Sequence, residues 1–157
     1  MDCQIVGYDE NYCNDISSII TRNLLEEHSK VYGIEKMLKD SLKFTPEMIT
    51  EHSKTRRFFV ALDGETVVGT VAVAKNKYAG EYDYVILTVF VLPEHHGKGI
   101  GKLLVEHAEM HVQKLSGKTI SIPAAIPAQG FYRKMGYDYA DGNEPNSDGF
   151  IWMERVL

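Results

Sequence analysis

Residues 91–104 read Val-Leu-Pro-Glu-His-His-Gly-Lys-Gly-Ile-Gly-Lys-Leu-Leu, and this stretch decides the fold. An apolar strand ends at Pro93, which has no N–H to donate to a neighbouring strand. Alternate glycines follow, where the backbone can turn tightly and approach a ligand without a Cβ in the way. The apolar spacing then becomes helical, so the stretch predicts a strand, a tight turn and a helix in immediate succession.

The glycine-rich turn has the properties of an anion site. The first turn of a helix carries unpaired N–H groups and a partial positive charge, which together favour phosphate or pyrophosphate. Lys98 and Lys102 add positive charge at the same place. A P-loop is excluded because Leu103 follows Gly101-Lys102 where Ser or Thr is required. The Rossmann dinucleotide motif is excluded because its third glycine comes one residue too early.

The rest of the chain has the pattern of a sheet covered by helices. Helical spacing predicts two or three short helices within residues 11–55, and single helices at Gly101–Leu115 and Ala125–Met135. Six strands are expected, at Arg57–Leu62, Thr66–Ala74, Tyr82–Leu92, Lys118–Ile122, Tyr137–Ala140 and Phe150–Val156. This order predicts an α/β or α+β fold in a single domain, residues 1–157.

The helix after the glycine turn is expected to be amphipathic. Its core-facing side is predicted to consist of Leu104, Ala108, Val112 and Leu115. Its solvent-facing side is predicted to consist of Lys102, Glu106, Glu109 and Gln113.

Composition limits the class of protein. The 157 residues include 17 Lys and Arg against 22 Asp and Glu, and this net charge of -5 counts against nucleic-acid binding. No apolar run approaches the ~18 residues of a membrane span, and the first residues lack the pattern of a signal peptide. Cys3 and Cys13 are expected to be reduced thiols. We therefore expect a cytoplasmic protein with no membrane partner.

The glycine turn resembles the acetyl-coenzyme-A binding motif of the GNAT N-acetyltransferases. That motif is a strand ending Val-x-Pro, followed by Gln/Arg-x-x-Gly-x-Gly/Ala, and its last six positions are here residues 96–101. Both glycines match, and His96 stands where the family has Gln or Arg. The resemblance implies the following coenzyme-binding residues: Val89, Phe90, Val91, His96, Gly97, Lys98, Gly99, Ile100, Gly101 and Lys102.

A second segment supports the same resemblance. Residues 128–137, Ala-Gln-Gly-Phe-Tyr-Arg-Lys-Met-Gly-Tyr, are similar to the family's Ala-x-x-Phe-Tyr-x-x-x-Gly-Phe/Tyr segment. In the family this segment brings a tyrosine to the coenzyme sulfur, which implies that role for Tyr132. Ala125 stands where many members have an Asn that contacts the pantetheine arm. The implied fold is a GNAT-like, mixed and mostly antiparallel twisted central sheet of about six or seven strands, flanked by helices.

The chemistry implied by the resemblance is direct attack of an amine on the acetyl-CoA thioester. An alkylamine, with a pKa of about 10.4, must first lose a proton, and Asp83 is the first candidate base, with Glu81 second. Main-chain N–H groups of residues 89–91 are expected to stabilise the oxyanion that forms. Tyr132 is expected to protonate the leaving thiolate, since a phenol with a pKa of about 10 and a thiol of about 8.5 are well enough matched.

Three further groups of residues leave alternatives open. His107 and His111 lie four apart, but Ala108 breaks the zincin pattern and no third ligand is evident, so no metal is expected. Acceptor-pocket lining and strand packing are both compatible with the aromatic residues Tyr78, Tyr82, Tyr84 and Phe90. Attraction of a cationic amine and simple solvation are both compatible with the acidic residues Asp138, Asp141, Glu144 and Asp148.

Three hypotheses about function result. The first is an N-acetyltransferase that transfers an acetyl group from acetyl-CoA to a primary amine of a small molecule or peptide. The second is a non-catalytic acyl-CoA-binding sensor, motivated by His96 and Ala125. The third is an enzyme with another phosphate ligand, such as ATP or NADH. GNAT-like proteins are often dimers, so a homodimer is one expected assembly.

Overall fold

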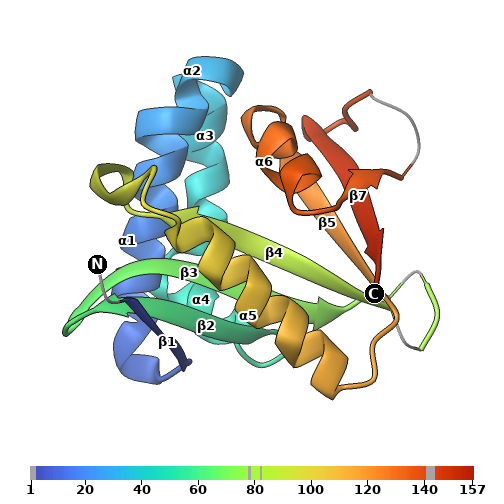
Figure 1. Ribbon diagram of the computed structural model, residues 1–157. Coiled ribbons are helices and arrows are strands. Elements are labelled where there is room, and N and C mark those ends of the chain that lie inside the picture. Colours follow the sequence, from blue (N-terminus) through green and yellow to red (C-terminus); the bar gives the residue numbers. More distant parts are fainter. Residues whose placement is uncertain (1–2, 78, 82, 141–143) are drawn as a thin grey trace.

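The computed structural model describes residues 3–77, 79–81, 83–140 and 144–157. Seven strands form one sheet in the order β1-β2-β3-β4-β5-β7-β6 (Figure 1). Their bounds are β1 Cys3–Gly7, β2 Arg57–Asp63, β3 Thr66–Lys75, β4 Asp83–Val91, β5 Thr119–Ala125, β6 Asp138–Tyr139 and β7 Phe150–Val156. The expected mixed, mostly antiparallel sheet flanked by helices is confirmed. β1 is an addition to the six expected strands, since five residues including Gln4 and Gly7 carry too weak an apolar pattern to predict one.

The sheet opens between its two central strands. β4 and β5 are parallel neighbours, and they pair only where Asp83–Val85 lies beside Thr119–Ser121. The other neighbouring strands are antiparallel. Past this pairing β4 continues to Val91 and β5 to Ala125 without register between them. The carboxyl ends of these strands are therefore separated, and the facing edge of β4 has no strand partner there.

The helices follow the expected order. Their bounds are α1 Cys13–Asn23, α2 Ser29–Tyr32, α3 Ile34–Ser41, α4 Pro46–His52, α5 Ile100–Lys114 and α6 Gln129–Lys134. A π-helical turn, Leu24–His28, joins α1 to α2, and 3-10 turns lie at Glu10–Tyr12, Leu42–Phe44, Pro93–His95 and Ile126–Ala128. α4 begins where Thr45 accepts a hydrogen bond from the Met48 N–H and Pro46 takes the first helical position.

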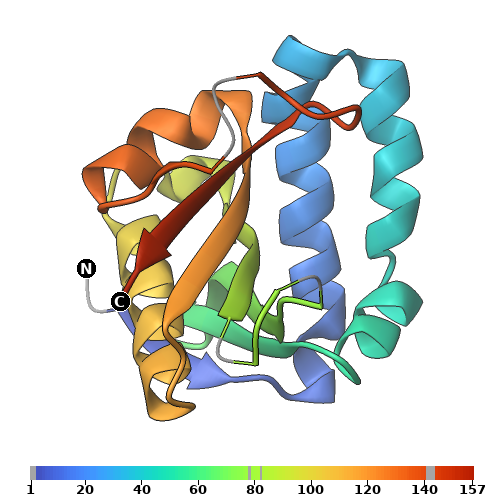
Figure 2. The ribbon, with the colours of Figure 1, turned by 90° about the vertical axis from the view of Figure 1, so that its right-hand side faces the viewer.

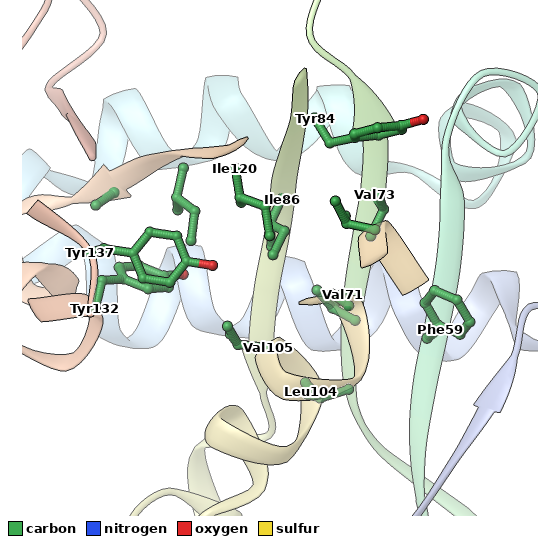
Figure 3. Close-up of a cluster of buried hydrophobic side chains, with 14 of the residues drawn as sticks. Phe59, Val71, Val73, Tyr84, Ile86, Leu104, Val105, Ile120, Tyr132 and Tyr137 are labelled. Carbon is green, nitrogen blue, oxygen red and sulfur yellow. The ribbon is translucent and has the colours of Figure 1, made fainter. Parts of the chain in front are cut away.

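An apolar cluster covers each face of the sheet. On one face α5 packs across the strands. The cluster on this face includes Leu104, Val105, Ala108, Phe59, Val71 and Ile86. On the other face α1, α3 and α4 pack, and the members include Ile16, Ile20, Met37, Ile49, Phe58 and Val60 (Figure 1). Burying each such side chain stabilises the fold by about 1.5–3 kcal/mol. Figure 3 shows Tyr132 and Tyr137 together at one end of the first cluster and Phe59 at the other.

Two expectations about α5 were wrong. Glu109 is only 8% exposed, although its spacing predicts a solvent-facing residue. Its carboxylate accepts hydrogen bonds of 2.8 Å from the Tyr137 hydroxyl and from the Arg155 guanidinium, which compensate for its burial. Leu115, predicted for the core, is 45% exposed because α5 ends one residue earlier.

Candidate active site

The glycine-rich turn presents its main-chain amides outward. Gly97 and Gly99 have φ values of 78° and 82°, a left-handed backbone that favours glycine, and α5 starts directly after Gly99. The amides of residues 97–102 donate to no protein group in the part of the chain that the structure describes, whereas the Leu103 N–H already bonds to the Gly99 carbonyl. Six consecutive N–H groups are thus available at the start of a fifteen-residue helix.

Hydrogen bonds hold the end of β4 to α1 and to the glycine-rich turn. The Val91 carbonyl accepts hydrogen bonds of 2.8 Å from the Asn23 side-chain amide and from Nε2 of His96. A carbonyl oxygen only accepts, so Nε2 of His96 carries the proton. His96 therefore holds the turn against β4 instead of extending that nitrogen toward a ligand.

A cavity of about 720 Å³, here called the loop cavity, lies beside this turn. Its walls come from α1 and the π-helical turn, from the end of β4, from the glycine-rich turn and from α6. Its lining residues include Asn23, His28, Val89, Phe90, Val91, His96, Gly97, Gly99, Ile100, Gly101, Lys102, Phe131 and Tyr132. The loop cavity thus combines free main-chain amides with two lysines, Lys30 and Lys102, and an apolar wall.

A second cavity of about 280 Å³, here called the helix cavity, lies between the helices before β2 and the open β4–β5 edge. Its charged lining residues are Lys36, Asp40, Lys43, Arg56 and Asp148. Its aromatic lining residues are His28, Tyr32, Phe44, Phe90, Tyr132 and Phe150. Figure 2 shows α1 and α3 on one side of the molecule and β5, α6 and β7 on the other.

The two cavities meet where β4 and β5 separate. Five residues line both of them, namely His28, Val89, Phe90, Ala128 and Tyr132. β4 carries a bulge here, because Thr70 pairs with Phe90 while Ala72 pairs with Leu87, and Thr88 has a φ of 50°. These five shared residues define the junction between the loop cavity and the helix cavity.

Tyr132 brings a hydroxyl to the junction. Its side chain is buried, and within residues 3–77, 79–81, 83–140 and 144–157 no hydrogen bond engages its hydroxyl. Burial raises its pKa above the ordinary value of 10.0, so the phenol is protonated at neutral pH. Its ring lies 6.0 Å from that of Tyr137, whose hydroxyl is held by Glu109. Tyr132 is therefore a proton donor with a free O–H.

His28, on the π-helical turn, also lines both cavities at the junction. Its ring centroid lies 5.6 Å from that of Phe90 and 6.1 Å from that of Tyr32. Burial lowers its pKa below 6.5, and nearby Glu27 opposes this to a smaller extent. The imidazole is therefore neutral at pH 7 and has a lone pair that can accept a proton.

Tyr32 lines the helix cavity at the end where α2 meets β5 and β7. Its hydroxyl donates to the Gly149 carbonyl at 2.8 Å and accepts from the Ile126 N–H at 2.9 Å. These bonds tie α2 to the end of β5 and to the segment before β7. Asp148 lines the helix cavity and precedes Gly149, so this exposed residue lies at the Tyr32 end of the cavity.

Comparison with known proteins identifies the family. The family model described as "Acetyltransferase (GNAT) domain" matches residues 54–139, more than half of the 157 residues. This chain belongs to the GNAT acetyltransferase family. The expected resemblance is confirmed. No protein of curated function matches the sequence at a significant level.

Solved GNAT structures share the whole fold. The PaiA N-acetyltransferase of Thermoplasma acidophilum, solved with coenzyme A, has a TM-score of 0.83 at 17% identity, covering 100% of both chains. A GNAT acetyltransferase of Staphylococcus aureus Mu50 has a TM-score of 0.77 at 20% identity, covering 99% of both chains. YncA of Salmonella typhimurium, solved with acetyl-CoA, has a TM-score of 0.71 at 15% identity, covering 100% of this chain and 95% of YncA. At these identities the likeness shows the fold.

The loop cavity contains most of the expected coenzyme-binding residues. All of them line the loop cavity except Lys98, whose side chain does not reach its wall. Ala125 lines the helix cavity instead, close to Phe150 across the β5–β7 pairing.

The two candidate bases, Asp83 and Glu81, lie away from the junction of the two cavities. Asp83 begins β4, six residues or about 20 Å along the strand from Val89. Its carboxylate accepts hydrogen bonds from the Gly80 N–H at 2.7 Å and from the Thr119 hydroxyl. Glu81 is exposed in the preceding turn. Neither residue lines the loop cavity or the helix cavity, so the structure does not place Asp83 or Glu81 beside Tyr132.

The alternatives left open for the aromatic and acidic residues divide. Phe90 and Asp148 line the helix cavity, whereas Tyr84 is strand packing in the α5-side cluster. Asp138 and Glu144 are exposed away from both cavities. The remaining expected residues, Tyr78, Tyr82 and Asp141, lie outside the described residues.

His28 and Arg56 were missed because they belong to the helical first third of the chain. His28 lies four residues after Leu24 on the same helix face, and this spacing was the available signal.

His107 and His111 pack edge-on against the Phe59 ring, at 4.6 and 5.2 Å between centroids. Among the residues described, no group of three or more His, Cys, Asp or Glu side chains could hold a metal. No helix in the described parts is long and apolar enough to cross a bilayer.

Proposed function

We propose that this GNAT protein is an N-acetyltransferase that transfers an acetyl group from acetyl-CoA to a primary amine. The observation that carries the proposal is the junction, where Tyr132 and His28 lie between the two cavities. The loop cavity is suited to the coenzyme and the helix cavity to the acceptor, so the reacting groups would meet beside both residues.

The loop cavity fits coenzyme A in chemistry. Its pyrophosphate needs several N–H donors and positive charge, which the free amides of residues 97–102 and the Lys102 ammonium supply. The pantetheine arm needs main-chain partners, which β4 supplies at Val89 and Phe90, where no described strand pairs with this edge; the Val91 carbonyl is already engaged by Asn23 and His96. Two structurally similar GNAT proteins, solved with coenzyme A and with acetyl-CoA, support this assignment.

When bound, acetyl-CoA supplies a thioester that a neutral amine attacks directly. Tyr132 donates its proton to the sulfur that leaves. Burial raises the pKa of this phenol, so Tyr132 keeps its proton until a thiolate forms beside it.

His28 accepts the proton of the attacking amine, directly or through one water. Because burial keeps the imidazole neutral, it has a lone pair available at pH 7. Amide N–H groups at the β4 bulge stabilise the negative charge that develops on the acyl oxygen. His28 thus takes the place first expected for Asp83.

The test is a free-thiol assay across a panel of primary amines, with calorimetric measurement of coenzyme A binding. We expect Tyr132→Phe to lower kcat about 100-fold or more while the Kd for coenzyme A stays unchanged. Tyr84→Phe is the matched control, since it removes a hydroxyl from another buried tyrosine that lines neither cavity.

The outcomes separate the hypotheses. Unchanged turnover in Tyr132→Phe would remove the role given to this tyrosine. Tight coenzyme A binding with no thiol release from any amine would favour the acyl-CoA-binding sensor. Tighter binding of ATP or NADH than of coenzyme A would end the acetyltransferase proposal.

A further inference from the structure

The helix cavity has two chemically different ends. At one end are His28, Tyr32 and the exposed Asp148, close to the junction with the loop cavity. Lys36 lies over the Tyr32 ring at 5.9 Å, which places the start of α3 at this end. Figure 2 shows α3 running from there, antiparallel to α1, toward α4 at the other side of the fold.

The far end of the helix cavity is basic. The 3-10 turn after α3 contributes Lys43 and Phe44, and the Phe44 ring contacts the His52 ring at 6.1 Å. Arg56 follows α4, and its N–H bonds to the His52 carbonyl at 2.9 Å. These contacts place Lys43 and Arg56 together, a full length of α3 away from Tyr32.

The acidic residue near this end is already neutralised. Asp40 pairs with Lys36 at 2.9 Å through Oδ2 and with Lys43 at 3.8 Å through Oδ1. The three cationic lining residues therefore exceed the acids available to them within the cavity, because Asp148 lies at the opposite end. The local excess of charge at the far end is positive.

Arg56 has no ion-pair partner among the residues that the structure describes. Its side chain is half-buried, and in the described ranges no carboxylate or carbonyl accepts a hydrogen bond from its guanidinium. Burial lowers its pKa, because part of the guanidinium is removed from water. A half-buried cation in a cavity wall is stabilised when an anion binds there. A second polar group of the same wall, the buried Thr88 hydroxyl, also lacks a partner among the described residues.

We infer that the acceptor amine carries an anionic group, a carboxylate or a phosphate, which Arg56 binds at the far end of the helix cavity. The position of the amine rests on the proposed acetyltransferase function, whereas the anion site at Arg56 does not depend on it. The amine of such a molecule lies beside His28 while its anion lies beside Arg56. The acceptor class is therefore an amino acid or a phosphorylated amine, and a simple alkylamine or a diamine is a poorer substrate.

The first experiment compares amines of one length that differ only at the far group. Amino-carboxylates with three to six carbons, the corresponding amino-amides, alkylamines and diamines, and aminoalkyl phosphonates are assayed for kcat/KM by thiol release. We expect the best anionic amine to exceed its amide by about 10-fold to 100-fold, as for a charge-assisted hydrogen-bond pair. The carboxylate and phosphonate series distinguish the two kinds of anion. An equal or higher kcat/KM for the amide or the diamine would overturn the inference.

Variants locate the effect. Arg56→Gln should abolish the preference by lowering kcat/KM for the anionic amine alone. Arg57→Gln is the matched control, since the neighbouring arginine is exposed and lies over the Phe59 ring, on the α5 side of the sheet. A preference that survives Arg56→Gln, or is lost equally in Arg57→Gln, would show that Arg56 does not bind the anion.

A binding experiment separates this inference from the proposed function. Hexanoate and butylphosphonate, which have no amine, are titrated calorimetrically into the protein and into Arg56→Gln. Binding of either anion by the wild type, lost in Arg56→Gln, supports the anion site even if no amine is acetylated. Absence of binding by both anions, together with normal acetylation of neutral amines, would refute the anion site and leave the acetyltransferase intact.

Discussion

The two cavities are built in different ways. The loop cavity owes its ligand groups mainly to one continuous stretch, residues 89–102, and these groups are mostly main-chain amides. The helix cavity takes side chains from the π-helical turn, α2, α3, the 3-10 turn after α3, β4, β5, α6 and the segments before β2 and β7. The family model matches residues 54–139, which include the first stretch but not the helices before β2. On the proposed assignment, the coenzyme site of this chain depends on backbone geometry and its acceptor site depends on individual side chains.

The comparison is tested most strongly at the junction, with His28→Gln. This variant keeps a polar side chain but removes the base, so we expect kcat to fall about 100-fold. Coenzyme A affinity should stay unchanged, because the glycine-rich turn is untouched. Since burial lowers the pKa of His28 below 6.5, the wild-type kcat should fall only when the pH drops through that lowered value, and the variant should lose this limb. Steady-state kcat between pH 5 and pH 8 is the measurement.

His52→Gln is the matched control for this variant. Burial also lowers the pKa of His52, but this residue lines neither cavity. Its substitution should leave the pH profile of kcat as in the wild type. If both variants lose activity alike, or if His28→Gln retains the acid limb, His28 is not the base.

The same difference explains what the sequence could predict. Pro93, the alternating glycines and the helical spacing that follows are local signals, and the turn they predict is the one observed. Tyr132 was placed by a contiguous motif, and it lies at the junction. Asp83 was predicted as the base because it begins the strand that leads to the glycine-rich turn. β4 is nine residues long, so Asp83 lies at the end of the strand opposite to the junction. Arg56 and His28 are brought to one cavity only by the packing of α1, α3 and α4 on the sheet, which no local pattern describes.

On the coenzyme side, Gly99→Ala should affect the backbone alone. A Cβ at this position meets no atom within 4 Å, so the substitution acts through the φ of 82°. Moving a non-glycine residue into the left-handed region costs about 1–2 kcal/mol, and relaxation of the turn would misplace the amides. We expect coenzyme A affinity to fall about 10-fold, measured by calorimetry.

Gly64→Ala provides the matched control for the turn. Gly64 has a φ of 63° in the β2–β3 hairpin and open space around it, so its backbone cost is similar. Both variants should lose comparable thermal stability, but only Gly99→Ala should bind coenzyme A more weakly. An equal loss of affinity in both would mean that general destabilisation, and not the position of the amides, controls binding.

The smallest effect on activity is expected for Asp83→Asn, and it sharpens the distinction between fold and site. The carboxylate accepts hydrogen bonds from the Gly80 N–H and the Thr119 hydroxyl, which hold the start of β4 against β5. An amide retains one acceptor oxygen, so we expect a loss of about 1 kcal/mol in stability, or roughly 2–4 °C in Tm. kcat should remain within about two-fold of the wild type, because a proton cannot pass directly along the about 20 Å of strand that separate Asp83 from Val89. Thermal unfolding and thiol release on the same preparation measure both quantities. A large fall in kcat at unchanged Tm would return Asp83 to the catalytic machinery and would mean that the acceptor approaches from the paired end of β4, opposite to the junction.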